Sequence, residues 1–166
     1  MSTVRDIQLA RKARAAGAEH SLRIILEARR AGLPISLAFA LVEQESGFKN
    51  IFGCDQGSIM CHQAVTKDRV QRLLRHVRAG GVSNGVGLTQ LTWPGYIIMA
   101  ERLGGAHIPR NQIRVGFSIL AGHIAKHGED GGLASYNAGD PFNPQGRRYA
   151  REVQERQSKW HKILTR

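Results

Sequence analysis

Two glutamates close an apolar stretch early in the chain, ISLAFALVEQESG. On a helix, Glu45 would extend a stripe of three apolar side chains at helical spacing: Ala38, Leu41 and Val42. A carboxyl beside apolar surface is poorly solvated, so its pKa is expected to rise, and the negative end of the helix dipole raises it further. A carboxyl that stays protonated near neutral pH suits a general acid, so Glu45 is the candidate catalytic residue.

Glu43 is the competing glutamate on the same stretch. Two residues correspond to about 200° around a helix, so the carboxyls of Glu43 and Glu45 cannot closely share one site. The alternative is that either glutamate is a solvated charge at a helix end.

Three later segments are unusual when they occur together. GVGLTQLT, residues 85–92, has glycines that allow close backbone approach and the amide of Gln90. ASYNAG places the ring of Tyr136 beside the amide of Asn137, and RRYAREV contributes Tyr149. Taken singly, these segments also read as a turn, a capped helix end and a core or rim aromatic. Trp93, after the Gln90 segment, suits a cleft or the core about equally.

Two cysteines lie in one irregular stretch. Cys54 and Cys61 would form a disulfide in an oxidising space or remain thiols, and the spacing leaves both alternatives open. With Asp55 and His62 they would offer metal ligands, but the spacing matches no common zinc site. We therefore expect no metal and no cofactor.

The residues that position these groups follow a helical pattern almost throughout. Gly17 is an expected hinge and Gly32 an expected stop, while Thr66 and Pro94 are expected helix starts. A strand or hairpin is conceivable only near 48–62 or 88–92, and no alternation of strands and helices supports a Rossmann or P-loop fold. The expected helices span residues 4–31 (one helix, or two hinged), 34–46, 67–78, 94 to about 104, 110–127, a short turn at 132–137, and 147 to the end.

Composition indicates an ordinary globular protein that is attracted to polyanions. The 166 residues are 42% hydrophobic and 22% charged, with 24 Lys plus Arg against 13 Asp plus Glu and a net charge of +11. Nucleic acid, anionic lipid and acidic wall polymers are all candidate partners. No apolar run is long enough for a membrane span, and the N-terminal stretch has no signal-peptide h-region. We therefore expect a chain that is made in the cytosol and does not insert into a membrane, and that something else must deliver if it acts outside the membrane.

Four motifs in this order resemble the catalytic domain of soluble lytic transglycosylases, in the goose-type lysozyme superfamily. The resemblance covers about residues 33–156. VGLTQLTW and its flanking segments further resemble transglycosylase domains in endolysins of actinobacterial phages. Thr89 stands where the family usually has Met, Ser135 replaces an Ala, and Cys54 replaces a His of the phage group. The matching residues are Glu45-Ser46, Gly87-Leu88-Thr89-Gln90, Ser135-Tyr136-Asn137-Ala138-Gly139 and Tyr149.

The resemblance implies a mainly α, lysozyme-like fold: two helical lobes around a glycan-binding groove, with little or no β structure. It implies one domain overall, a catalytic part at 33–166 with a basic helical segment at 1–32 packed on it. Glu45 would cleave the β-1,4 bond between N-acetylmuramic acid and N-acetylglucosamine. The other implied site residues bind sugar or position the acid: Ser46, Gln90, Tyr136, Asn137 and Tyr149.

Asp55 decides between two enzymes that cleave this bond. A hydrolase needs a second carboxyl to activate water, and Asp55 is the best candidate, although a loop Asp that caps a turn explains it too. We therefore predict a monomeric lytic transglycosylase of a phage endolysin that acts on peptidoglycan strands, with a muramidase as the alternative enzyme. A non-catalytic nucleic-acid-binding or phage structural protein is the alternative of another class, and no nucleic acid is expected as partner.

Overall fold

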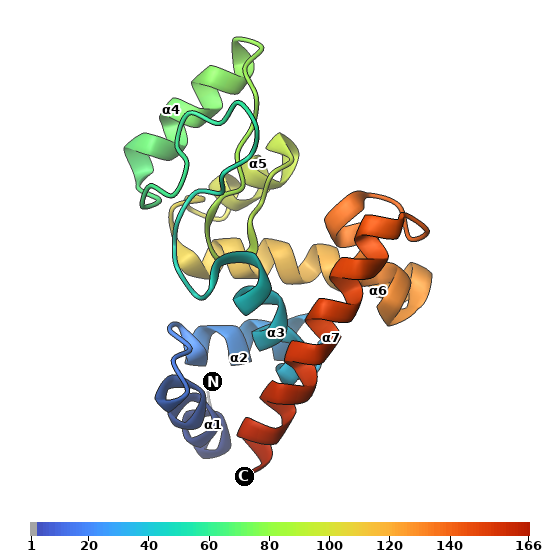
Figure 1. Cartoon of the computed structure of the whole chain (residues 1–166). Coiled ribbons are helices and arrows are strands. Elements are labelled where there is room, and N and C mark those ends of the chain that lie inside the picture. Colours follow the sequence, from blue (N-terminus) through green and yellow to red (C-terminus); the bar gives the residue numbers. More distant parts are fainter. Residues whose placement is uncertain (1–2) are drawn as a thin grey trace. The chain divides into compact units, whose positions relative to one another are not determined.

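The structure is a computed structural model that describes residues 3–166, and within these residues it is mainly helical (Figure 1). The only β pairing in this range consists of two isolated antiparallel bridges, Ile51 with Ala64 and Phe52 with Val86. The prediction of a mainly α chain with little β structure is confirmed. The helices are α1 (Val4–Ala15), α2 (Ser21–Ala31), α3 (Ile35–Ser46), α4 (Lys67–Arg78), the 3₁₀ helix η1 (Gly87–Thr89), α5 (Pro94–Arg102), α6 (Pro109–Ala138) and α7 (Pro144–Thr165).

The chain divides into two compact units. The central unit is Glu45–Gly116, and the terminal unit combines the residues up to Gln44 with Phe117–Arg166. Within the terminal unit α1 packs against both α2 and α7, and Lys12 Nζ lies 3.5 Å from the carbonyl oxygen of Leu164. The expected division at residue 32 stays a prediction. Of the described helices, none combines the length and apolarity that crossing a bilayer requires.

Most helix ends lie where the sequence predicts them. Residues 4–31 form two helices, and Gly17 lies between them with φ +93°. Gly32, at φ +70°, ends α2 in the left-handed conformation that glycine adopts without steric cost. The Thr66 hydroxyl accepts the Arg69 N–H at 3.4 Å and caps α4.

The span α6 consists of two helices that meet at Gly128, whose backbone is non-helical (φ 74°, ψ 176°). The expected break after residue 127 is therefore confirmed, and the second helix extends to Ala138. The last helix begins at Pro144 rather than near 147. The reason is the cap: Asn143 Oδ1 accepts the N–H groups of Gln145 and Gly146 at 2.9 and 3.1 Å, and proline at the first helical position has no N–H to satisfy.

Helix α3 supplies the centre of the terminal unit. Its six consecutive residues Leu37–Val42 are buried, as an apolar sequence without a polar face predicts. The ring of Phe39 stacks on Trp160 of α7 with centroids 4.9 Å apart. The core of this unit therefore fixes the helix on which the two glutamates lie.

Asp6 is a buried carboxylate that ties α1 to α2. It accepts the backbone N–H of Thr3 at 3.0 Å in a capping box and the Arg29 Nε–H at 2.8 Å, and it is 1% exposed. The Thr3 backbone hydrogen bond, with the Thr3 hydroxyl and Arg29, holds the pKa of Asp6 below its usual value against the opposing effect of burial.

We expect this carboxylate to make the stability of the chain depend on acid. Because the folded pKa is depressed, the stabilisation is present above the unfolded pKa of about 3.9 and is lost as pH falls through the folded pKa. Asp6→Ala should cost about 2 kcal/mol at neutral pH, since a cap and an ion pair are lost together. Urea unfolding at pH 7 and pH 3 measures it, and a difference from wild type that is as large at pH 3 contradicts it.

Candidate functional site

Glu45 lies in the last turn of α3, one residue before the helix ends at Ser46. It is half-buried, and the apolar residues of its predicted stripe, Ala38, Leu41 and Val42, are all fully buried. Gly47 follows with φ +57°, so the chain turns sharply after the glutamate. The predicted position at a helix end is confirmed, and the raised pKa of Glu45 stays a prediction.

Glu43 has a different environment from Glu45. In the terminal unit its Oε2 accepts the Trp160 Nε1–H at 2.9 Å, and its Oε1 lies 2.5 Å from Lys159 Nζ. Arg156 Nη1 is 4.0 Å from the same carboxylate. Both oxygens of Glu43 therefore anchor α7 to α3.

Ser46 connects the end of α3 to the GVGLTQLT segment. Its hydroxyl donates a hydrogen bond to the carbonyl oxygen of Leu88, at 3.0 Å within the central unit. Two of the predicted motifs are thus in direct contact although 42 residues separate these positions. The bond fixes the residue next to Glu45 relative to η1.

Gln90 holds two backbone segments together. Its Nε2 donates to the carbonyl oxygens of Ile51 and Gly87, at 3.1 and 2.8 Å, and its own backbone is left-handed with φ +47°. A Cβ added at Gly53 or Gly85 would overlap Gln90 Oε1. The predicted close approach at Gly85 is confirmed, and it seats the carboxamide of Gln90 between two glycine backbones.

Gln112, on α6, is the organising residue that the sequence analysis missed. It is fully buried; its Oε1 accepts the Leu88 N–H at 3.0 Å, and its Nε2 donates to Asn50 Oδ1 at 2.8 Å and to the Ala106 carbonyl at 2.7 Å. Its backbone oxygen accepts the Thr89 hydroxyl at 2.8 Å. The hydrophobic periodicity of the sequence does not distinguish this glutamine from one on the surface. The only sequence signal for its burial is its position between two apolar turns of α6.

Thr89 and Trp93, which precede and follow Gln90 in the chain, differ in burial. Thr89 is fully buried, and a Cβ on Gly116 would overlap its side chain. Trp93 is 62% exposed, which excludes the core role that the sequence left open. Its ring meets Tyr96 edge-on with centroids 4.9 Å apart.

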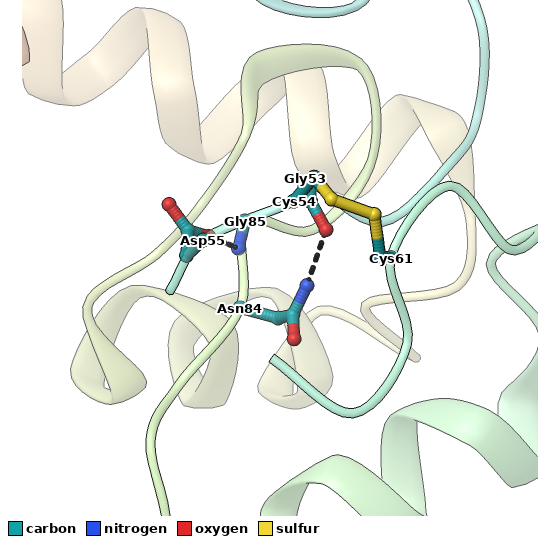
Figure 2. Close-up of a disulfide and its surroundings, with 6 residues drawn as sticks. All are labelled: Gly53, Cys54, Asp55, Cys61, Asn84 and Gly85. Atoms are coloured by element: carbon teal, nitrogen blue, oxygen red, sulfur yellow. Dashed lines mark hydrogen bonds between the residues drawn. A yellow bond between two sulfur atoms is a disulfide. The ribbon is translucent and has the colours of Figure 1, made fainter. Parts of the chain in front are cut away.

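Asp55 and the two cysteines lie near Asn84 and Gly85 (Figure 2). Asp55 is exposed, and its Oδ2 accepts the Gly85 N–H at 2.9 Å. Cys54 and Cys61 form a disulfide with their Cα atoms 4.4 Å apart, which settles the alternatives that the sequence left open. The ligand atoms of Cys54, Cys61 and His62 lie within 4.8 Å of one another, but sulfurs joined in a disulfide are not thiolate ligands.

The remaining predicted site residues belong to the terminal unit. Tyr136 is half-buried and Asn137 exposed in the last turn of α6, whereas Tyr149 on α7 is 8% exposed. A Cβ on Gly146 would lie 2.7 Å from the Ala134 carbonyl oxygen, so α7 starts in close contact with the segment that carries Tyr136. The sugar-binding and positioning roles of these residues stay predictions.

Comparison with known proteins supplies a fold and no sequence family. No family model and no curated protein matches the chain. The X-ray structure of an inactive variant of the lytic transglycosylase Slt from Pseudomonas aeruginosa is similar, with a TM-score of 0.59 and 20% sequence identity over 89% of this chain. The match covers 24% of that protein, so the chain corresponds to about a quarter of its length. The chain therefore has the lysozyme-like fold that the sequence motifs predict.

Proposed function

We propose that this chain is a lytic transglycosylase that cleaves peptidoglycan glycan strands with Glu45 as its acid and base. The observation that carries the proposal is the position of Glu45: it closes α3, beside a serine bonded to the GVGLTQLT segment, in a fold similar to that of a lytic transglycosylase. The engagement of both Glu43 oxygens by α7 supports the choice between the two glutamates.

The proposed chemistry uses one carboxyl twice. Protonated Glu45 gives its proton to the glycosidic oxygen as the C1–O bond of N-acetylmuramic acid breaks, and the substrate's acetamido oxygen stabilises the positive charge at C1. The Glu45 carboxylate then removes the proton of the C6 hydroxyl, whose oxygen bonds to C1. The products are a 1,6-anhydro sugar and a free 4-hydroxyl, and Glu45 is again protonated.

The contact of Asp55 favours this reaction over hydrolysis. An inverting muramidase needs a carboxylate that is free to activate water. Asp55 instead holds the Gly85 N–H through Oδ2, as the turn-capping interpretation of its sequence position predicts. The muramidase remains the alternative enzyme.

Product analysis tests the proposal directly. We expect purified peptidoglycan digested by the chain to release muropeptides with 1,6-anhydro ends, about 18 Da lighter than hydrolytic products because no water is added. Mass spectrometry of the soluble fraction measures this difference. Reducing-end products would establish the muramidase, and no soluble glycan at all would contradict both enzymes.

The setting of the activity rests on the phage-endolysin resemblance and on charge. We place the enzyme in a phage endolysin that reaches the wall from the host cytoplasm and acts as a monomer. Its net charge of +11 would raise its local concentration on an anionic wall, so wall binding should weaken with salt. A basic nucleic-acid binder would instead show tight duplex binding that sugar oligomers do not affect.

A further inference from the structure

The segment around the disulfide meets the backbone on which Gln90 is seated. The Gly53 N–H donates to the Gly85 carbonyl at 2.8 Å, and the Gly85 N–H donates to Asp55 Oδ2 at 2.9 Å. Asn84 Nδ2 donates to the Gly53 carbonyl at 2.6 Å, as Figure 2 shows. Three hydrogen bonds thus join residues 53–55 to residues 84–85, with a side chain from each segment taking part.

This pairing determines the slot that holds the Gln90 carboxamide. A Cβ on either Gly53 or Gly85 would lie 2.3 Å from Gln90 Oε1, so the carboxamide would have to shift to make room. The Nε2 of Gln90 bridges the carbonyl oxygens of Ile51 and Gly87, which lie two residues before the first segment and two residues after the second. If residues 53–55 separate from residues 84–85, Gly53 and Gly85 no longer enclose the Gln90 carboxamide from both sides.

The disulfide holds the outer end of this arrangement. Phe52 is already paired with the 62–63 segment, because its N–H donates to Gln63 O at 2.9 Å and its O accepts the His62 N–H at 3.1 Å. Cys54, directly after Gly53, is exposed and is fixed to Cys61 by the disulfide alone among the described contacts. Asp55, one residue further, reaches Gly85 from an exposed loop, so its bond depends on where Cys54 is held.

We infer that the Cys54–Cys61 disulfide, Asp55 and Asn84 form a redox-sensitive clamp that holds Gln90, and with it the GVGLTQLT segment, in the arrangement that glycan cleavage needs. The inference rests on the proposed function for the glycan step. The residues of this clamp are positioning residues, since they act through Gly53 and Gly85. A dithiol reductant would open the clamp by two thiol–disulfide exchanges. Two electrons pass to the Cys54–Cys61 bond, each released thiolate takes up a proton, and the dithiol becomes a cyclic disulfide.

Hydrogen exchange and kinetics on the same samples test the clamp. In the oxidised chain the Gly85 N–H and the Gln90 side-chain N–H₂ should exchange slowly by NMR. After dithiothreitol, with two thiols per chain confirmed by titration, we expect exchange of the Gly85 N–H to become at least tenfold faster. We also expect kcat/KM on purified peptidoglycan to fall about tenfold. A Cys54→Ser, Cys61→Ser double variant should match the reduced chain and should not respond to dithiothreitol.

Variants of Asp55 separate the clamp from a general loss of stability. Asp55→Ala keeps the disulfide but removes the acceptor for Gly85, so it should reproduce both effects. Asp55→Asn retains a side-chain oxygen and should restore slow exchange and most of the activity, whereas a water-activating carboxylate would lose its function in this variant. Gln56→Ala, at an exposed position of the same loop, is the matched control and should change neither readout.

Each outcome decides the inference. Unchanged Gly85 exchange after reduction overturns the clamp, whatever the activity. Faster exchange with unchanged kcat/KM overturns its link to glycan binding. If the oxidised chain cleaves no glycan, the proposed function fails, and the exchange data by themselves then establish or reject the clamp.

Discussion

Glu45→Gln is expected to reduce glycan cleavage by at least about 10³-fold while leaving the fold intact. Glutamine has nearly the same shape as glutamate, but it cannot give a proton to the glycosidic oxygen or remove one from the C6 hydroxyl. General acid–base catalysis contributes roughly 10²–10⁴-fold to one proton transfer, and both steps here depend on the same group. The initial rate of soluble muropeptide release from purified peptidoglycan measures the effect, with circular dichroism and the melting temperature as checks of folding.

Glu43→Gln is the matched control, because the same substitution is made two residues away on the same helix. Its carboxylate contacts Lys159 and Trp160 rather than substrate, so most of the activity should remain. Stability should fall by about 1 kcal/mol: the ion pair is partly exposed and screened, and glutamine can still accept the Trp160 hydrogen bond. An active Glu45→Gln, or an inactive but folded Glu43→Gln, would reverse the assignment of the two glutamates.

The helices could be predicted because local chemistry determines their ends. Thr66 accepts a first-turn N–H, Pro94 begins a helix without needing an N–H partner, and Gly32 adopts a left-handed conformation. The error at the last helix also has a local cause, because the Asn143 cap starts α7 before its apolar pattern becomes visible.

The contacts around the candidate site depend on pairs that lie far apart in the chain. Sequence motifs predict Glu45, Ser46 and Gln90 as site residues. They do not predict that Ser46 bonds to Leu88 or that Gln90 donates its amide N–H groups to backbone carbonyls. Asp55 was predicted either as a catalytic carboxyl or as a turn cap, and only its partner Gly85 favours the cap. Spacing indicates which side of a helix a residue occupies, whereas hydrogen-bond partners across a unit follow from tertiary packing.

The buried Gln112 is the clearest case, because it satisfies three polar groups that no other described contact replaces. Its side chain pairs with the Leu88 N–H, with Asn50 Oδ1 and with the Ala106 carbonyl. In a double-mutant cycle of Gln112→Leu with Asn50→Ala, the two losses of unfolding free energy should therefore be non-additive by about 1 kcal/mol or more, since residues in one hydrogen-bond network couple. Ser118→Ala, at an exposed position of the same helix, should change stability by less than about 0.5 kcal/mol.

Gln112→Leu itself is expected to destabilise the chain by about 3–4 kcal/mol. Leucine fills a similar volume, so the loss comes from buried partners that can no longer form hydrogen bonds, at roughly 1 kcal/mol or more each. That is a large share of the 5–15 kcal/mol that holds a typical domain folded. Urea unfolding followed by circular dichroism measures it. Because the backbone N–H of Leu88 at η1 then loses its side-chain acceptor, activity should fall even where the variant is fully folded. A stability within 1 kcal/mol of wild type would mean that water or a rearranged η1 satisfies these groups, and that Gln112 does not organise the segment beside Glu45.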